Sequence, residues 1–178
     1  MKKLTTILVV VLAVAFTSNI FAQNSATVAS ASASAKIIAP ITLSNSVAMD
    51  FGTVASTTDG GDVTLVVAPN GSVTRTFENS NAQATTLGNP KSAKFDVAGE
   101  ANAAYNISIP ADGVVSLNGP SGSTPMAVKT FTSTVATNGG TLNGSGTQTF
   151  YVGATLDVNA TQTAGTYSGT YSVTVQYQ

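Results

Sequence analysis

The sequence predicts an all-β protein, an antiparallel β-sandwich built from short strands. Only 8% of the residues are charged, and Thr, Val, Tyr and Phe, which favour strands, are common. Seven or more short segments alternate between apolar and polar residues and are separated by turn residues. After the first 22 residues, no window longer than ten residues has the spacing of an amphipathic helix. The 178 residues are expected to form one domain.

The first 22 residues are predicted to be a signal peptide. Lys2 and Lys3 form a basic start, an apolar run covers residues 4–16, and Ala22 offers a small residue for cleavage. The apolar run is shorter than the roughly 20 residues that a spanning helix needs, so no membrane span is expected after cleavage. The sequence therefore predicts an exported protein, located in the periplasm, at the cell surface or outside the cell.

Residues 23–34 are predicted to be an Ala/Ser-rich N-terminal extension, and residues 35–178 the β-sandwich domain. From residue 29 the chain alternates, and one face holds Ala29, Ala31, Ala33, Ala35 and Ile37. Period-two alternation predicts an extended strand. Two alternatives are open: this strand pairs within its own domain, or it is donated to another molecule.

The domain holds a series of predicted strands. Pro69-Asn70-Gly71 separates residues 63–68 from 72–77 and predicts a hairpin, because Asn-Gly supplies two turn positions that need positive φ. The other predicted strands are residues 93–97, 104–109, 114–117, 127–135, 149–158 and 170–177. In the last of these, one face is expected to pack and the other to meet water. The packed face consists of Tyr171, Val173, Val175 and Tyr177.

The composition argues against catalysis and against nucleic-acid binding. The chain has no Cys and no His, which removes thiol nucleophiles, His general bases and zinc-finger ligand sets. The carboxylates are scattered, and Asp59-Gly60-Gly61-Asp62 lacks the spacing of a calcium loop. Cationic residues are few and not clustered. We therefore expect no enzyme activity, no cofactor, no metal and no nucleic-acid partner.

Three groups of short motifs follow one another along the chain. The first is AKIIAPITL (residues 35–43) with MDFGTV (49–54), and the second is AKFDVAG (93–99) with YNISIP (105–110). The third is VGATL (152–156) with AGTYSGTYSVTV (164–175). With these motifs, the chain resembles a family of secreted bacterial β-sandwich domains known as domain of unknown function 4402. That family looks related to spore coat protein U domains and to chaperone–usher pilins.

The resemblance implies an immunoglobulin-like, pilin-like sandwich with Greek-key connections. Pilins of the chaperone–usher class end in an alternating strand with a penultimate aromatic residue and an upstream glycine, positions that Tyr177 and Gly165 match. An open groove in each such subunit receives the N-terminal extension of the next, which is strand addition to an exposed edge. The implied partners are copies of this chain, related surface subunits, or a periplasmic chaperone. Residues 24–35 would supply the donated strand, although their alanines are smaller than the usual donor residues.

Two functions are expected on this basis. The first is a structural or adhesive surface protein, a fimbria-like subunit that assembles by β-strand pairing. The candidate pairing residues are Ala29, Ala31, Ala33, Ala35, Ile37, Gly165, Tyr171, Val173, Val175 and Tyr177. The second is a free-standing secreted binding module for a glycan or another surface ligand, for which a chain without Trp supplies few aromatic platforms.

Overall fold

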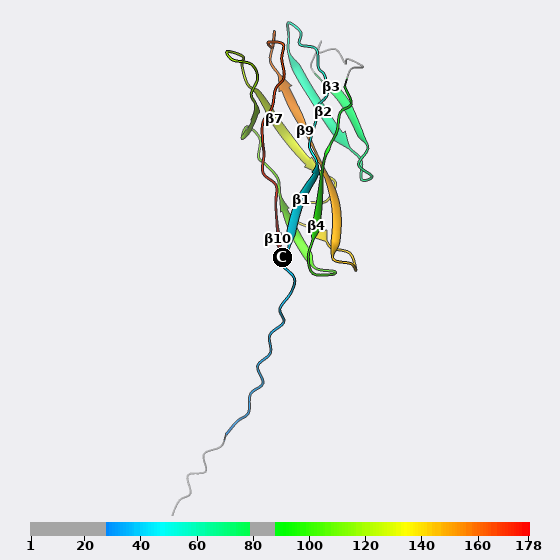
Figure 1. The fold of residues 1–178 in the computed structure, drawn as a ribbon, viewed down its shortest axis with the longest axis vertical. Helices are drawn as coiled ribbons and strands as arrows, with labels where there is room; N and C mark the ends of the chain where they lie inside the picture. Colours follow the sequence, from blue (N-terminus) through cyan, green and yellow to red (C-terminus); the bar gives the residue numbers. More distant parts are fainter. Residues whose placement is uncertain (1–27, 79–87) are drawn as a thin grey trace, which may run out of the picture. The chain divides into compact units, whose positions relative to one another are not determined.

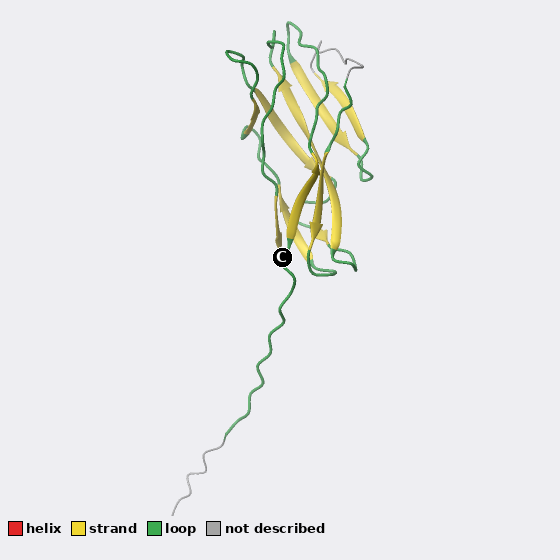
Figure 2. Ribbon diagram, viewed as in Figure 1, coloured by secondary structure: helices red, strands yellow, loops and turns green. Residues whose placement is uncertain are grey.

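The computed structural model describes residues 28–78 and 88–178, and these form ten β-strands and no helix (Figure 2). The all-β prediction is therefore confirmed. The predicted signal peptide lies outside the described residues. The chain divides into two units, Met1–Lys36 and Ile37–Gln178, and all ten strands belong to the second.

Residues 28–36, the described part of the first unit, form no strand and are all exposed. Figure 1 draws this segment as an extended trace. The strand predicted over residues 29–37 is therefore wrong for this structure, and no ladder among the described residues includes that segment. The physical reason is that alanine side chains bury little apolar surface, so alternation alone contributes little energy to hold a strand. We call residues 23–38 the N-terminal tail below.

The larger sheet is organised around the long strand β9 (Thr147–Val158), which pairs with different strands along its two halves. Its first half pairs with β4, and its second half lies between β2 and β7. The strand order is β1–β4–β9–β2–β3, with β7 also on β9 and β6 on β7, and every pair is antiparallel. The bounds are β1 Thr42–Val47, β2 Gly61–Val67, β3 Val73–Glu78, β4 Ala93–Ala98, β6 Val115–Leu117 and β7 Met126–Ser133.

The smaller sheet has the order β10–β5–β8, with β10 at Thr174–Tyr177, β5 at Ala104–Ser108 and β8 at Gly140–Thr141. Its Tyr105 is fully buried and donates a hydrogen bond from its hydroxyl to Gln148 Oε1 at 2.8 Å, on the first half of β9. Burial raises the pKa of Tyr105. Nearby, Phe95 and Phe150 stack with ring centroids 5.3 Å apart. This half of the molecule therefore has two layers that share one core.

Seven of the predicted strands form with ends displaced by no more than two residues. The predicted strand at residues 170–177 is shorter, because β10 begins only at Thr174. Its alternation is confirmed: the four apolar side chains from Tyr171 to Tyr177 are partly buried, and the residues between them are exposed. Two strands were not predicted. β8 is only two residues long, and β1 lies at a sheet edge with five of its six residues exposed, so neither produces an alternating pattern.

The predicted hairpin forms, but its turn differs from the prediction. Gly71 N donates to Ala68 O at 2.8 Å, and Ala68 N donates to Ser72 O at 3.0 Å. Only Gly71 has positive φ (+83°), whereas Asn70 does not. The prediction of two positive φ values is wrong because Pro69 fixes the first turn position near φ −65°. A type I turn followed by a left-handed glycine results.

Candidate binding groove

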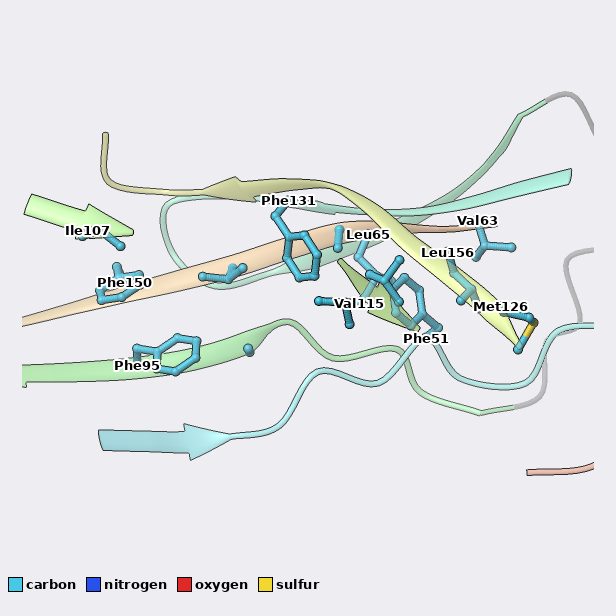
Figure 3. Packing of buried hydrophobic residues seen from close by; sticks show 14 of the residues in the cluster. Phe51, Val63, Leu65, Phe95, Ile107, Val115, Met126, Phe131, Phe150 and Leu156 are labelled. Atoms are coloured by element: carbon cyan, nitrogen blue, oxygen red, sulfur yellow. The ribbon is translucent and has the colours of Figure 1, made fainter. Parts of the chain in front are cut away.

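The second half of the larger sheet has no strand facing it among the described residues. This half contains β2, β3, β6, β7 and the second half of β9. Two segments that lie mostly outside strands, residues 47–58 and 161–171, form a groove with its strands β6, β7 and β9. They leave a groove of about 1240 Å³. Figure 3 shows several of the buried side chains that form its floor. The floor residues are Val115, Leu117, Met126, Val128, Leu156 and Val158.

The first wall of the groove, residues 47–58, leaves the sheet at a turn after β1. The Asp50 side chain accepts a hydrogen bond from Gly52 N at 2.7 Å, and Gly52 has φ +73°. Arg75, on β3, then holds the departing segment. Its Nη1 donates to Phe51 O at 2.8 Å and to Thr53 O at 3.1 Å. A side chain therefore fixes the position of this wall.

The second wall, residues 161–171, is held by a network of side chains. Gln162 Nε2 donates to Thr124 O at 2.6 Å and to the Tyr167 hydroxyl at 2.7 Å. The Tyr167 hydroxyl donates to Thr163 O at 2.8 Å, and Asn159 Nδ2 donates to Gln162 Oε1 at 2.7 Å. Because these bonds use side chains, the wall keeps its place although it belongs to no strand.

Backbone contacts tie the second wall to its surroundings at two points. Ser168 and Asn118 form an isolated antiparallel bridge next to β6. Thr161 N donates to Thr57 O at 2.8 Å, which joins the two walls to each other. The groove therefore has two fixed sides and is suited to a ligand that needs little rearrangement of the protein.

The lining of the groove is mostly uncharged. Asp50 and Lys91 are the two charged lining residues, and the remainder are apolar, hydroxyl-bearing, amide or glycine residues. The Thr57 hydroxyl is buried and has no hydrogen-bond partner among the described residues. Leaving a buried hydroxyl unpaired costs about 1–3 kcal/mol, so this wall of the groove carries a local energetic cost.

Two predicted pairing residues, Gly165 and Tyr171, line this groove. Gly165 lies against Pro120, whose ring a Cβ at this position would meet. The Tyr171 ring packs on Phe131 with centroids 5.3 Å apart and an interplanar angle of 48°. Burial raises the pKa of Tyr171 to about 12.

The other predicted pairing residues lie elsewhere. Val175 pairs with Ile107 in the smaller sheet, and Val173 packs against the core nearby. The penultimate Tyr177 accepts a hydrogen bond at its hydroxyl from Glu100 N at 2.6 Å and donates to Ala39 O at 2.8 Å. It therefore links the segment before β1 to the loop after β4. The remaining candidates are exposed and unpaired in strands, namely Ala29, Ala31, Ala33, Ala35 and Ile37.

Sequence reasoning did not identify the residues that build the groove, namely Phe51, Thr57, Arg75 and Gln162. A local signal exists only for the first wall, where the Asp-Phe-Gly sequence is compatible with a turn closed by the Asp50 side chain. The role of Arg75 depends on partners 22 and 24 residues away in sequence, and Gln162 bonds Thr124, 38 residues away, besides its local partners. No local pattern encodes such partners.

Residues 28–78 and 88–178 contain no group of three or more carboxylate, His or Cys side chains close enough to hold a metal ion. The same residues form no helix that is long and apolar enough to cross a membrane.

The fold and the groove define a class: an all-β protein with two antiparallel sheets, in which one half of the larger sheet is faced by irregular segments instead of strands. The chain belongs to the family described as Domain of unknown function (DUF4402), which matches it over residues 41–177. The resemblance to that family is thus confirmed, and the N-terminal tail lies before the matched range. No curated protein and no solved structure matches the chain.

Proposed function

We propose that this protein is an exported, non-catalytic structural or adhesive subunit of the cell surface, fimbria-like, that assembles by β-strand pairing. In this proposal the groove of one molecule receives the N-terminal tail of another. The observation that supports it best is that one chain carries both a groove and an alternating segment that suits it. No strand of the described residues covers the groove, and the described part of the tail, residues 28–38, is exposed and belongs to no strand, while residues 29–37 alternate with period two.

The same proposal includes the finer description of the fold as an immunoglobulin-like, pilin-like sandwich with Greek-key connections. The sheet order supports it, since β1, β4, β9 and β2 are neighbours in space but not in sequence. Export is proposed from the signal-peptide pattern of residues 1–22. A periplasmic chaperone is included as a transient partner, because it would hold the groove until the tail of another molecule enters it.

The length of the tail favours a second molecule over the tail's own groove. Ala39 is held by Glu100 Oε2 and by the Tyr177 hydroxyl. From there to Val47, where the groove begins, is about 26 Å of extended chain. A tail folding back would use about eight of its sixteen residues on the return, leaving only about eight to lie in the groove.

A tail inserted into another molecule has no such return path. All sixteen residues are then available to the groove, which makes exchange between copies the better fit. Each molecule would use its tail on one neighbour and its groove on another. Such a contact is heterologous and extends into an open chain of subunits unless the geometry closes it.

The proposal is tested by comparing the mature chain, beginning at Gln23, with a double variant that places charge on the alanine face, Ala31→Asp/Ala33→Asp. The matched control, Ser32→Asp/Ser34→Asp, adds the same charge to the opposite face. We expect concentration-dependent oligomers of the mature chain and of the control, and their loss in the alanine-face variant, by light scattering coupled to size-exclusion chromatography. Equal behaviour of both variants, or a mature chain that stays monomeric at every concentration, contradicts the proposal.

A second candidate function is a free-standing module that binds a glycan or another surface ligand. The hydroxyl-rich walls favour this candidate, because Ser and Thr residues such as Ser56, Thr58 and Thr166 line the groove beside Tyr167. A glycan array probed with the monomeric alanine-face variant separates the two functions. Specific binding there favours the module, and uniform silence counts against it.

A further inference from the structure

We infer that the groove selects a strand whose inward-facing side chains are small, because two aromatic residues of the groove's own walls, Phe51 and Tyr171, fill the space that bulky donor residues would take. This inference rests on the proposed function. It names the kind of strand that the groove admits, and it explains why the tail carries alanines.

Phe51 fills the groove from the first wall. Its side chain is only 8% exposed, belongs to the buried core, and lines the groove. Figure 3 shows its ring in the same buried cluster as Val115 and Leu156, two residues of the floor. Because Arg75 holds the Phe51 carbonyl at 2.8 Å, the backbone that carries this ring is fixed.

Tyr171 does the same from the second wall. Its ring packs on Phe131, which lies on β7, and the side chain is partly buried against the core. Two residues before it, a Cβ at Gly169 would meet Ser116 O, so the backbone of this wall lies close against β6. The Ser168–Asn118 bridge ties the wall to the chain next to β6, so moving the wall outward would break these backbone hydrogen bonds.

The floor itself is already covered. Five of its residues, Val115, Met126, Val128, Leu156 and Val158, have exposed fractions between 2% and 7%. Floor side chains packed this closely leave no deep hole for a large inserted residue. The open volume therefore lies between the walls, where a backbone with methyl side chains fits and where longer side chains meet Phe51 and Tyr171. The alternating alanines of the tail have this size.

The test enlarges one face of the tail at a time in the mature chain. The single variants are Ala29→Leu, Ala31→Leu, Ala33→Leu and Ala35→Leu, and the matched control is Ser32→Leu, which adds a similar bulk to the other face. We expect at least one alanine substitution to raise the dissociation constant of self-association about tenfold or more, the size of an overpacking penalty. The control is expected to stay within about threefold of the unsubstituted tail.

The same four Leu substitutions are then combined with Tyr171→Ala, to test whether the Tyr171 ring is what excludes the larger side chains. The Tyr171→Ala protein is first checked for folding by its circular-dichroism spectrum. In it, the increase in the dissociation constant caused by at least one Leu substitution should shrink about tenfold. If every penalty is unchanged there, the role of Tyr171 is contradicted. If Leu on the alanine face strengthens association, the size selection is wrong while strand exchange itself stands. If neither face affects association and the mature chain is monomeric, the proposed function fails as well.

Discussion

The hydroxyl of the penultimate tyrosine offers a sharp test, because resemblance and structure give it different roles. The resemblance makes Tyr177 a candidate for pairing between molecules, whereas the structure shows it bonded within its own domain. Its hydroxyl accepts from Glu100 N at 2.6 Å and donates to Ala39 O at 2.8 Å. Tyr177→Phe removes both bonds and leaves the ring in place.

The expected cost follows from these two bonds. A typical hydrogen bond contributes about 1 kcal/mol, and a backbone group left unpaired adds to its loss. Ala39 is exposed, so water replaces one of the two bonds in part. We therefore expect Tyr177→Phe to lower the free energy of unfolding by about 1–2 kcal/mol. For a domain of this length the melting temperature then falls by about 2–8 °C.

Thermal unfolding followed by circular dichroism measures this change. The matched control is Tyr151→Phe, because the Tyr151 hydroxyl has no hydrogen bond among the described residues, and its substitution should stay within about 0.5 kcal/mol of wild type. Self-association of the folded Tyr177→Phe protein should equal that of wild type. A wild-type melting temperature together with lost association would refute the internal role and return Tyr177 to the intermolecular contact.

Three further predictions concern separate sites. Gly71→Ala should destabilise the β2–β3 hairpin by at least about 1–2 kcal/mol in denaturant unfolding, because an L-residue is strained at φ +83° and its Cβ would also meet the Tyr151 ring. An unchanged midpoint contradicts this. The Lys129 ammonium group forms ion pairs with Asp62 at 2.9 Å and with Asp157 at 3.2 Å. These pairs, the hydrogen bond to Asp62 most of all, raise the pKa of Lys129 above its usual 10.5 in the folded protein. The stabilisation that they give is therefore present below pH 10.5 and is lost as the pH rises through the higher pKa of the folded protein. Lys129→Met should therefore cost up to about 1 kcal/mol at pH 7, as for exposed ion pairs, and the difference should vanish above that pKa. Burial raises the pKa of Tyr171 to about 12 in the folded protein, whereas the tyrosine of the unfolded chain ionises near pH 10. The free energy of unfolding should therefore fall between pH 10 and 12. Tyr171→Phe should lessen this fall, measured by denaturant unfolding at a series of pH values.

The strands that the sequence predicted are those in which apolar and polar residues alternate over enough consecutive positions to be recognised without knowing the partner strand. β4 shows this well: its buried and partly exposed residues alternate along the strand, with Phe95 at its centre packed on Phe150. A period of two is a property of neighbouring residues, so it needs no knowledge of the partner strand. The tail shows the limit of the same rule, since its alternation is stricter than that of β4 but its alanines bury too little to form a strand alone.

The groove was beyond the reach of the sequence. Its floor comes from three strands, and its walls are held by Arg75 and Gln162 through partners far along the chain. Whether a strand faces a given half of a sheet depends on the paths of all the other segments, and no single window contains that information.

By itself, then, the sequence determined the strand-rich class, most strand positions, the alternating faces and the family, because periodicity, turn residues and motif order are local properties. Only the tertiary structure decided that one half of the larger sheet faces irregular segments, that Phe51 and Tyr171 fill the resulting groove, and that Tyr177 bonds within its own domain. These features depend on which distant segments meet, and close packing fixes that only when the whole chain folds.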